Sequence, residues 1–276
     1  MPNLLAGLAS LLWGTADFLG GLGVKGRSVL AFLTLTQLTG LTIVAVLLVV
    51  FPADPSDTDL LIGVISGVLT VVLAGSLYRS LALGPMNVAA PLSAVVGAAV
   101  PVAYGLATGE RPGVPAMLGI AVGLVGIVLV STAKAEEQHR VAPITLVLAA
   151  TAGAMIGIVN ILFAQTSADS GLWPFAMTKL VAFVVVGTAF LVLRFRTGQR
   201  LGGPLLPVAA GAADAGATMS LLLALQRGSL ILISILGGLF PVVTVVLARA
   251  FLKEPMTRWQ LAGLAAAVVA VVLLTV

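Results

Sequence analysis

Ten apolar stretches occupy most of the chain, and each is long enough to cross a membrane. A helix needs about 20 apolar residues to span the hydrocarbon core of a bilayer, because each residue adds about 1.5 Å along the helix axis. Only 9% of the 276 residues are charged, whereas about a quarter of the residues in a soluble domain are charged. The sequence therefore predicts an all-α, polytopic membrane protein with ten transmembrane helices, at 3–22, 29–51, 60–83, 86–107, 113–133, 141–168, 171–193, 204–226, 228–248 and 259–276.

These spans and their short connections leave no room for a soluble domain, so we expect the function to take place within the membrane. The first span lacks the basic lead and the small-residue cleavage site of a secretory signal, which indicates a true transmembrane helix. The chain has no cysteine, which excludes disulfides and thiolate metal sites. We expect a multi-pass integral protein of the cell membrane, without a cofactor, in contact with the lipid bilayer and not with nucleic acid.

The basic residues of the loops predict an orientation. Cytoplasmic loops of membrane proteins carry an excess of Lys and Arg. Only Arg111 and Arg227 fall in loops on one side of the predicted spans, together with the acidic linker 54–59. The other side holds Lys25, Arg27, Lys134, Arg140, Arg194, Arg196, Arg200, Arg249, Lys253 and Arg258. This distribution predicts that the side with more Lys and Arg is cytoplasmic and that both termini lie outside.

An internal repeat divides the chain into two halves. The stretch Gly109–Gly119 parallels Lys253–Gly263 at an offset of 144 residues, with Glu followed nine residues later by Gly in both. Thr36–Leu38 likewise matches Thr178–Leu180 at an offset of 142. We therefore predict a five-helix repeat at 1–135, a charged linker at 136–140 and a second five-helix repeat at 141–276. An odd number of spans in each half makes the repeat inverted, and in such folds substrates bind near the midplane between the halves.

These motifs are also similar to those of a known family. Leu12-Trp13-Gly14 in the first span, the stretch from Pro241 to Glu254, and the Glu-x8-Gly spacing in both halves resemble the EamA-type branch of the drug/metabolite transporter superfamily. The resemblance covers essentially the whole chain and implies a carrier that exports, or in some cases imports, small metabolites, amino acids or drugs. Many such relatives are described with both termini in the cytoplasm, whereas the loop charges here predict the reverse.

Four charged residues lie inside the predicted spans: Asp17, Arg79, Lys179 and Asp214. A charge at the centre of a transmembrane helix costs a few kcal/mol or more, so such residues face protein or water and have partners. Arg79 is close enough to the cytoplasmic end of its span to extend its guanidinium toward water. By depth, Lys179 is expected to pair with Asp214 and organise a cavity, which leaves Asp17 as the expected proton-coupling residue.

The repeat alignment places further polar residues beside these. Aligning Trp13-Gly14 with Ile156-Gly157 sets Asp17 opposite Asn160, and the matched triplets set Gln37 opposite Lys179. Since lipid-facing positions have no reason to be polar in both halves, we expect these four side chains to face a shared central cavity and to bind substrate. Intramembrane polar residues also hold helices together through hydrogen bonds, and for Asn160 and Gln37 this second interpretation is favoured.

Aromatic, glycine and proline residues complete the predicted site and its packing. Trp13 and Tyr78 are candidates to line a cavity for an aromatic or cationic ligand. Small-residue pairs such as Gly63-x3-Gly67 and Gly153-x3-Gly157 predict close helix packing. Pro91, Pro101 and Pro241 are expected to interrupt the fourth and ninth spans, because proline lacks the N–H that a continuous helix needs.

The sequence therefore favours a secondary transporter of a small molecule that works by alternating access, with export as the expected direction and proton coupling through Asp17. No nucleotide-binding loop is present to let ATP drive it. A lipid flippase or a channel is the main alternative. An intramembrane enzyme is disfavoured because Asp214 follows Gly211-Ala-Ala213 and not the Gly-x-Gly that precedes the aspartate of intramembrane aspartyl proteases.

Overall fold

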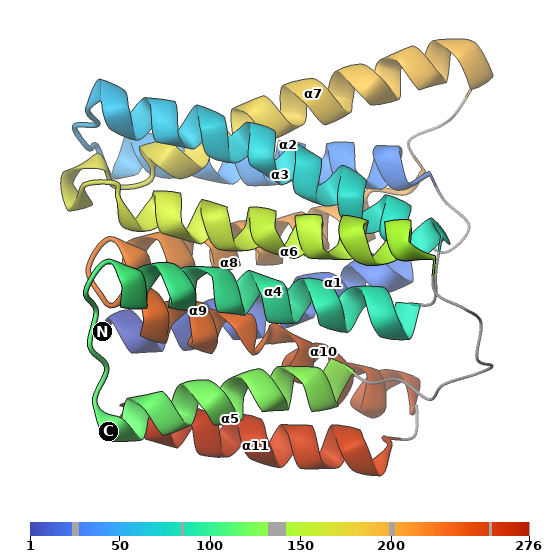
Figure 1. Cartoon of the computed structure of the whole chain (residues 1–276). Helices are drawn as coiled ribbons and strands as arrows, with labels where there is room; N and C mark the ends of the chain where they lie inside the picture. Colours follow the sequence, from blue (N-terminus) through green and yellow to red (C-terminus); the bar gives the residue numbers. More distant parts are fainter. Residues whose placement is uncertain (24–27, 84–85, 132–141, 199–201, 254–255, 276) are drawn as a thin grey trace.

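The computed structural model describes residues 1–23, 28–83, 86–131, 142–198, 202–253 and 256–275, and these are almost entirely helical (Figure 1). The 136–140 linker predicted between the repeats lies outside the described residues. The elements are α1 (Pro2–Gly23), α2 (Val29–Val50), α3 (Asp57–Leu83), α4 (Met86–Ala107), α5 (Val114–Ser131), α6 (Pro143–Ala164), the short 3₁₀ helix η1 (Ala168–Ser170), α7 (Trp173–Thr197), α8 (Leu205–Leu225), α9 (Leu230–Gly238), α10 (Phe240–Leu252) and α11 (Arg258–Thr275).

The ten predicted spans are confirmed, with boundaries that differ by a few residues. Seven segments of the described chain are long and apolar enough to cross a membrane, and α4, α5 and α11 contain shorter apolar helices. The ninth span is divided into α9 and α10 at Leu239, because Pro241 has no N–H to offer the carbonyl of Gly237. The fourth span differs from the expectation, since α4 stays helical through both Pro91 and Pro101.

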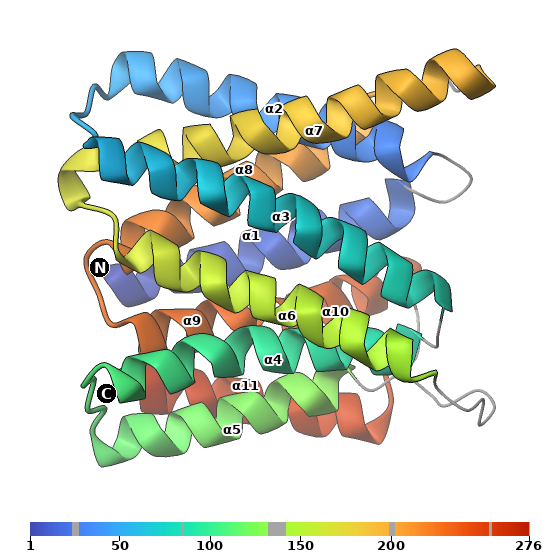
Figure 2. The ribbon, with the colours of Figure 1, turned by 45° about the horizontal axis from the view of Figure 1, so that its top comes forward.

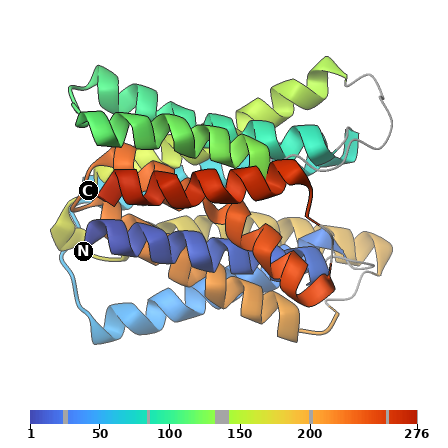
Figure 3. The ribbon, with the colours of Figure 1, turned by 90° about the horizontal axis from the view of Figure 1, so that it is seen from below.

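The two halves pack according to an inverted two-fold pattern. The first helices of the two repeats, α1 and α6, run in opposite directions (Figure 1). Each packs against the third helix of the other half: α1 against α8, and α6 against α3. The helix α1 also contacts α9 and α10, which together form the fourth span of the second half. In the same way, α6 contacts α4, the fourth span of the first half. The last helices, α5 and α11, lie side by side (Figure 3).

Glycines permit the closest of these approaches. A Cβ atom on Gly63 would lie 2.5 Å from the carbonyl oxygen of Pro174, so α3 and α7 are packed against each other without space for a side chain there. The same holds for Gly157 on α6, where a Cβ atom would lie 2.6 Å from the Cβ atom of Val100 on α4. The predicted close packing at these glycines is therefore confirmed.

Candidate functional site

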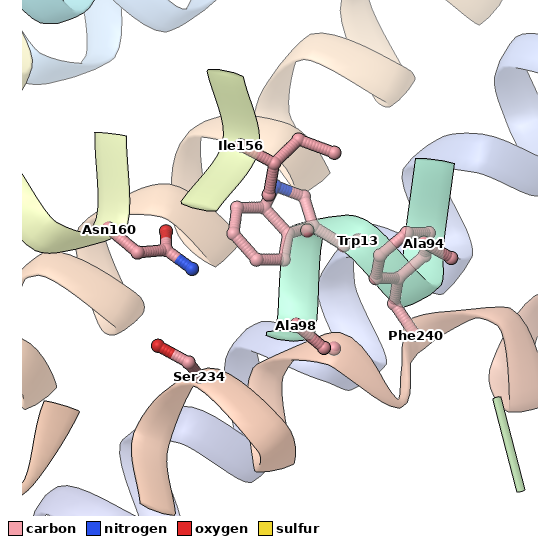
Figure 4. Close-up of a pocket in the computed structure, with 9 residues that line it drawn as sticks. Trp13, Ala94, Ala98, Ile156, Asn160, Ser234 and Phe240 are labelled. Carbon is pink, nitrogen blue, oxygen red and sulfur yellow. The ribbon is translucent and has the colours of Figure 1, made fainter. Parts of the chain in front are cut away.

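A small cavity lies where the two repeats meet, between α1, α4, α6, α9 and α10 (Figure 4). Its volume is about 20 Å³, which is room for about one water molecule. Among the described residues, no charged side chain lines it. Its walls are formed by Trp13, Ala94, Gly97, Ala98, Ile156, Asn160, Ser234, Gly238 and Phe240. Trp13 and Ile156, which the repeat alignment pairs, both contribute to the wall, so the cavity lies at the pseudo-symmetric centre of the fold.

The aromatic side of this cavity is built by the contact between α1 and α10. A Cβ atom on Gly14 would lie 2.7 Å from the carbonyl oxygen of Phe240, so only glycine allows α10 to begin so close to α1. The Thr244 hydroxyl donates a hydrogen bond of 3.2 Å to the carbonyl oxygen of Gly14. As a result the Trp13 and Phe240 rings meet edge to face, with centroids 6.1 Å apart and planes at 72°, an arrangement that aromatic pairs prefer.

The polar side of the cavity consists of Asn160 and Ser234, which lie close to each other in Figure 4. Asn160 is 6% exposed and Ser234 is 1% exposed. The Ser234 hydroxyl has no hydrogen-bond partner in the described part of the protein. An unpaired buried polar group costs about 1–3 kcal/mol. The hydrogen bond expected of Asn160 as a link between helices is not found within the described residues, and its amide instead borders the cavity.

A second polar cluster joins α2, α7 and α8. The Lys179 ammonium donates to the Asp214 carboxylate at 2.5 Å and to the Gln37 amide oxygen at 2.9 Å, and it lies 5.4 Å from the centre of the Phe175 ring. The expected Lys179–Asp214 pair is therefore found, and Gln37 makes a hydrogen bond between helices. The Lys179 side chain is 6% exposed, and it passes over Gly40, where a Cβ atom would lie 3.1 Å from the lysine Cε.

The structure divides the predicted site residues between several environments. Asn160 and Trp13 line the central cavity, whereas Gln37, Lys179 and Asp214 form the ion-paired cluster. Asp17 is exposed on α1 and lines neither of the two cavities described for this protein. Arg79 is exposed near the end of α3, in line with its expected extension toward water, and the Tyr78 side chain lies outside the described part of the structure.

Sequence reasoning missed Ser234 and Phe240. One signal pointed to Ser234, since it is the only polar side chain in the run Leu230–Leu239. Phe240 carries no such signal, because its role depends on how α10 approaches α1.

Comparison with known proteins agrees with this architecture. The EamA-like transporter family matches residues 1–132 and 143–276, which are the two halves of the fold. The chain belongs to the EamA-like transporter family. It is therefore a membrane transporter of the drug/metabolite transporter superfamily.

Solved structures support the fold of this EamA-like transporter. One, described only as the crystal structure of a protein, is 17% identical in sequence and superposes with a TM-score of 0.80, covering 99% of this chain and 95% of that one. None of the curated proteins matches the chain.

The two repeats of the transporter are also tied together at the end that carries both termini. Glu110, which follows α4, reaches the start of α9, where its carboxylate accepts hydrogen bonds from the Ser229 hydroxyl and from the backbone N–H of Leu230, at 3.1 Å, and of Ile231. A carboxylate at a helix N-terminus is stabilised by the unpaired N–H groups there. The repeat counterpart Glu254 lies outside the described residues.

Two further links hold the same end. The Gln226 amide donates to the Thr166 hydroxyl at 3.2 Å and to the Gly171 carbonyl at 3.1 Å. Asp59 is 3% exposed, and its carboxylate accepts from the Ser167 N–H at 2.8 Å. The contacts of Glu110 and Asp59 therefore join the two halves at this end, whereas those of Gln226 lie within the second half.

Proposed function

We propose that the protein is a secondary transporter that exports a small metabolite, amino acid or drug, and that the central cavity is its substrate site. The observation that carries this proposal is the buried, unpartnered Ser234 hydroxyl beside the cavity-lining Asn160 amide, in a cavity that the Trp13 and Phe240 rings also line. A substrate with an uncharged polar group and a flat apolar part suits this lining. Its polar group would supply the hydrogen bond that the Ser234 hydroxyl lacks.

Substrate binding requires the helices around the cavity to move apart, because about 20 Å³ holds a water molecule and nothing larger. In inverted-repeat carriers such movement opens the site to the two sides of the membrane in turn. The links that Glu110 and Asp59 make between the halves would then have to break when the terminal end opens. We propose alternating access on this basis.

Counterflow into sealed proteoliposomes tests the transport function. Amino acids, nucleobases and nucleosides are first screened for those that raise the thermal stability of the purified protein, and the hits are used as radiolabelled probes. We expect saturable uptake that Asn160→Leu abolishes, while Val184→Trp, at an exposed position of α7, retains it. Flux that does not saturate would indicate a channel, and movement of labelled phospholipid without solute uptake would indicate a flippase; either would overturn the proposal.

Coupling to protons is proposed for Asp17, which is exposed on α1 and whose carboxylate has no hydrogen-bond partner within the described residues. Asp214, by contrast, is held by Lys179. Asp17→Asn should abolish uptake driven by a pH gradient and leave exchange of preloaded substrate largely intact. Asp57→Asn, which changes an exposed carboxylate at the terminal end, is the matched control. Full gradient-driven uptake by Asp17→Asn would show that this residue is not the proton carrier.

The proposed location is the cell membrane, with both termini outside, on the evidence of the loop charges. The chain has no native cysteine, so single cysteines report on sidedness directly. A thiol reagent that cannot cross the membrane should label a cysteine in place of Asp57 in intact cells and should fail to label one in place of Gln138. The reverse pattern would place the termini in the cytoplasm.

A further inference from the structure

A larger groove lies on the flank of the protein, away from the central cavity. Its volume is about 770 Å³, within the range of small-molecule sites. The helices α1 and α2 both pack against α8 (Figure 2). The groove is lined by residues of these three helices and of the connections near the terminal end. Its apolar lining includes Leu8, Leu12, Leu47, Phe51, Met219 and Leu223. Because these helices form the membrane-spanning part of the protein, the apolar lining of the groove lies at a depth where lipid surrounds it.

The polar residues of the groove are acidic and unpaired. Asp54 and Asp169 lie at its edge, brought together by a hydrogen bond of 3.1 Å from the Asp54 N–H to the Asp169 carbonyl. Neither carboxylate has a partner within the described residues, and no Lys, Arg or His lines the groove. Ser220 also lines it. This serine is 8% exposed, and its hydroxyl has no hydrogen-bond partner in the same part of the structure.

We propose that this groove binds amphipathic cations, with the apolar part of the ligand between α1 and α2 and its ammonium group beside Asp54 and Asp169. The apolar lining suits an alkyl or aromatic body, and the carboxylates supply the charge that an ammonium group needs. The Ser220 hydroxyl lies in the groove and offers the ligand a buried hydrogen-bond acceptor or donor. A phospholipid is a poorer occupant, because its phosphate would lie against the same two carboxylates.

This site is separate from the proposed transport site and does not depend on it. The two share one helix, since Leu12 lines the groove and the next residue, Trp13, lines the central cavity. The groove therefore offers amphipathic cations a place to bind from the lipid phase, whichever solute the central cavity carries.

Titration calorimetry with dodecyltrimethylammonium tests the proposal, using the full-length protein in phosphatidylcholine nanodiscs and empty nanodiscs to subtract partitioning. We expect saturable binding by the wild type. Asp54→Asn and Asp169→Asn should each raise the dissociation constant about threefold, as expected for an exposed charge pair. Asp57→Asn removes a carboxylate at the same end that does not line the groove, and it should leave the constant unchanged.

A blocking variant and an uncharged ligand complete the test. Leu8→Trp fills the groove from a position that is 43% exposed, so it should abolish binding without unfolding the protein, as checked by size-exclusion chromatography. Dodecanol should show no saturable binding above partitioning. The proposal is overturned if dodecanol binds as tightly as the cation, if the two groove variants behave like Asp57→Asn, or if a photoreactive analogue of the cation labels helices other than α1, α2, α8 and η1.

Discussion

The two polar clusters inside the membrane region differ in one respect, which is whether their hydrogen-bonding groups are satisfied. In the cluster of Gln37, Lys179 and Asp214, the ammonium group has two hydrogen-bonding partners and an aromatic ring beside it. In the central cavity, the Ser234 hydroxyl is buried without a hydrogen-bond partner within the described residues, and the Asn160 amide borders the same cavity. Lys179, Asn160 and Ser234 are all buried, so burial alone does not distinguish a structural group from a binding group.

The difference indicates which cluster is available to a ligand. A paired buried charge holds its helices in place, and separating it leaves an uncompensated charge. An unpaired buried amide or hydroxyl costs stability in the empty protein, and a ligand that pairs with it recovers that cost. We therefore expect mutations in the first cluster to act mainly on folding and mutations in the second to act mainly on transport.

The largest expected effect comes from breaking the ion pair. Lys179→Met leaves the Asp214 carboxylate without its cation and should lower the free energy of unfolding by about 3–5 kcal/mol, measured by denaturant titration of the purified protein in detergent micelles. The double variant Lys179→Met/Asp214→Leu should recover most of this loss, because no charge is then left unpaired. If the single variant is as stable as the wild type, the ion pair does not stabilise the fold, and the proposed difference between the two clusters is wrong.

An intermediate effect is expected in the cavity, and it should appear in transport. Asn160→Leu should lower kcat/KM for uptake at least about tenfold, the loss of one good hydrogen bond to a polar substrate. Ser234→Ala should lower uptake as well, yet raise the free energy of unfolding by about 1 kcal/mol, because it removes a buried hydroxyl that has no partner within the described residues. A large loss of stability in Ser234→Ala would mean that this hydroxyl is satisfied in the working protein.

The smallest expected effect comes from crowding the lysine. Gly40→Ala places a Cβ atom 3.1 Å from the Lys179 Cε, so the aliphatic chain of the lysine must shift by a few tenths of an ångström. This shift should lower the free energy of unfolding by about 1 kcal/mol. Gly75→Ala on α3, where no atom lies within 4 Å of the added Cβ, is the matched control and should be neutral or stabilising. Equal stability of the two variants would show that the lysine stem is free to move.

Most of the fold follows from the sequence because the bilayer fixes the length of each span. The ion pair followed as well, since a charge in the membrane needs a partner. The role of Ser234 could not be predicted from the sequence, for a physical reason. Hydroxyl side chains in helices usually bond the carbonyl one turn back, as Thr34, Thr39 and Thr42 do here, and only the packed structure distinguishes a serine that does not.

The break between α9 and α10 makes the two halves unequal at the element that lines the cavity. Its counterpart α4 is one continuous helix, although it contains Pro101. If the opposite state of the transporter arises by the halves exchanging conformations, α4 would have to unwind where α9 and α10 would have to join. Because Pro241 has no N–H, a joined α9 and α10 would lack a hydrogen bond that a continuous helix needs, so the two states would differ in free energy even without a substrate. The resting population of such a carrier would then be biased toward one side of the membrane by its own backbone.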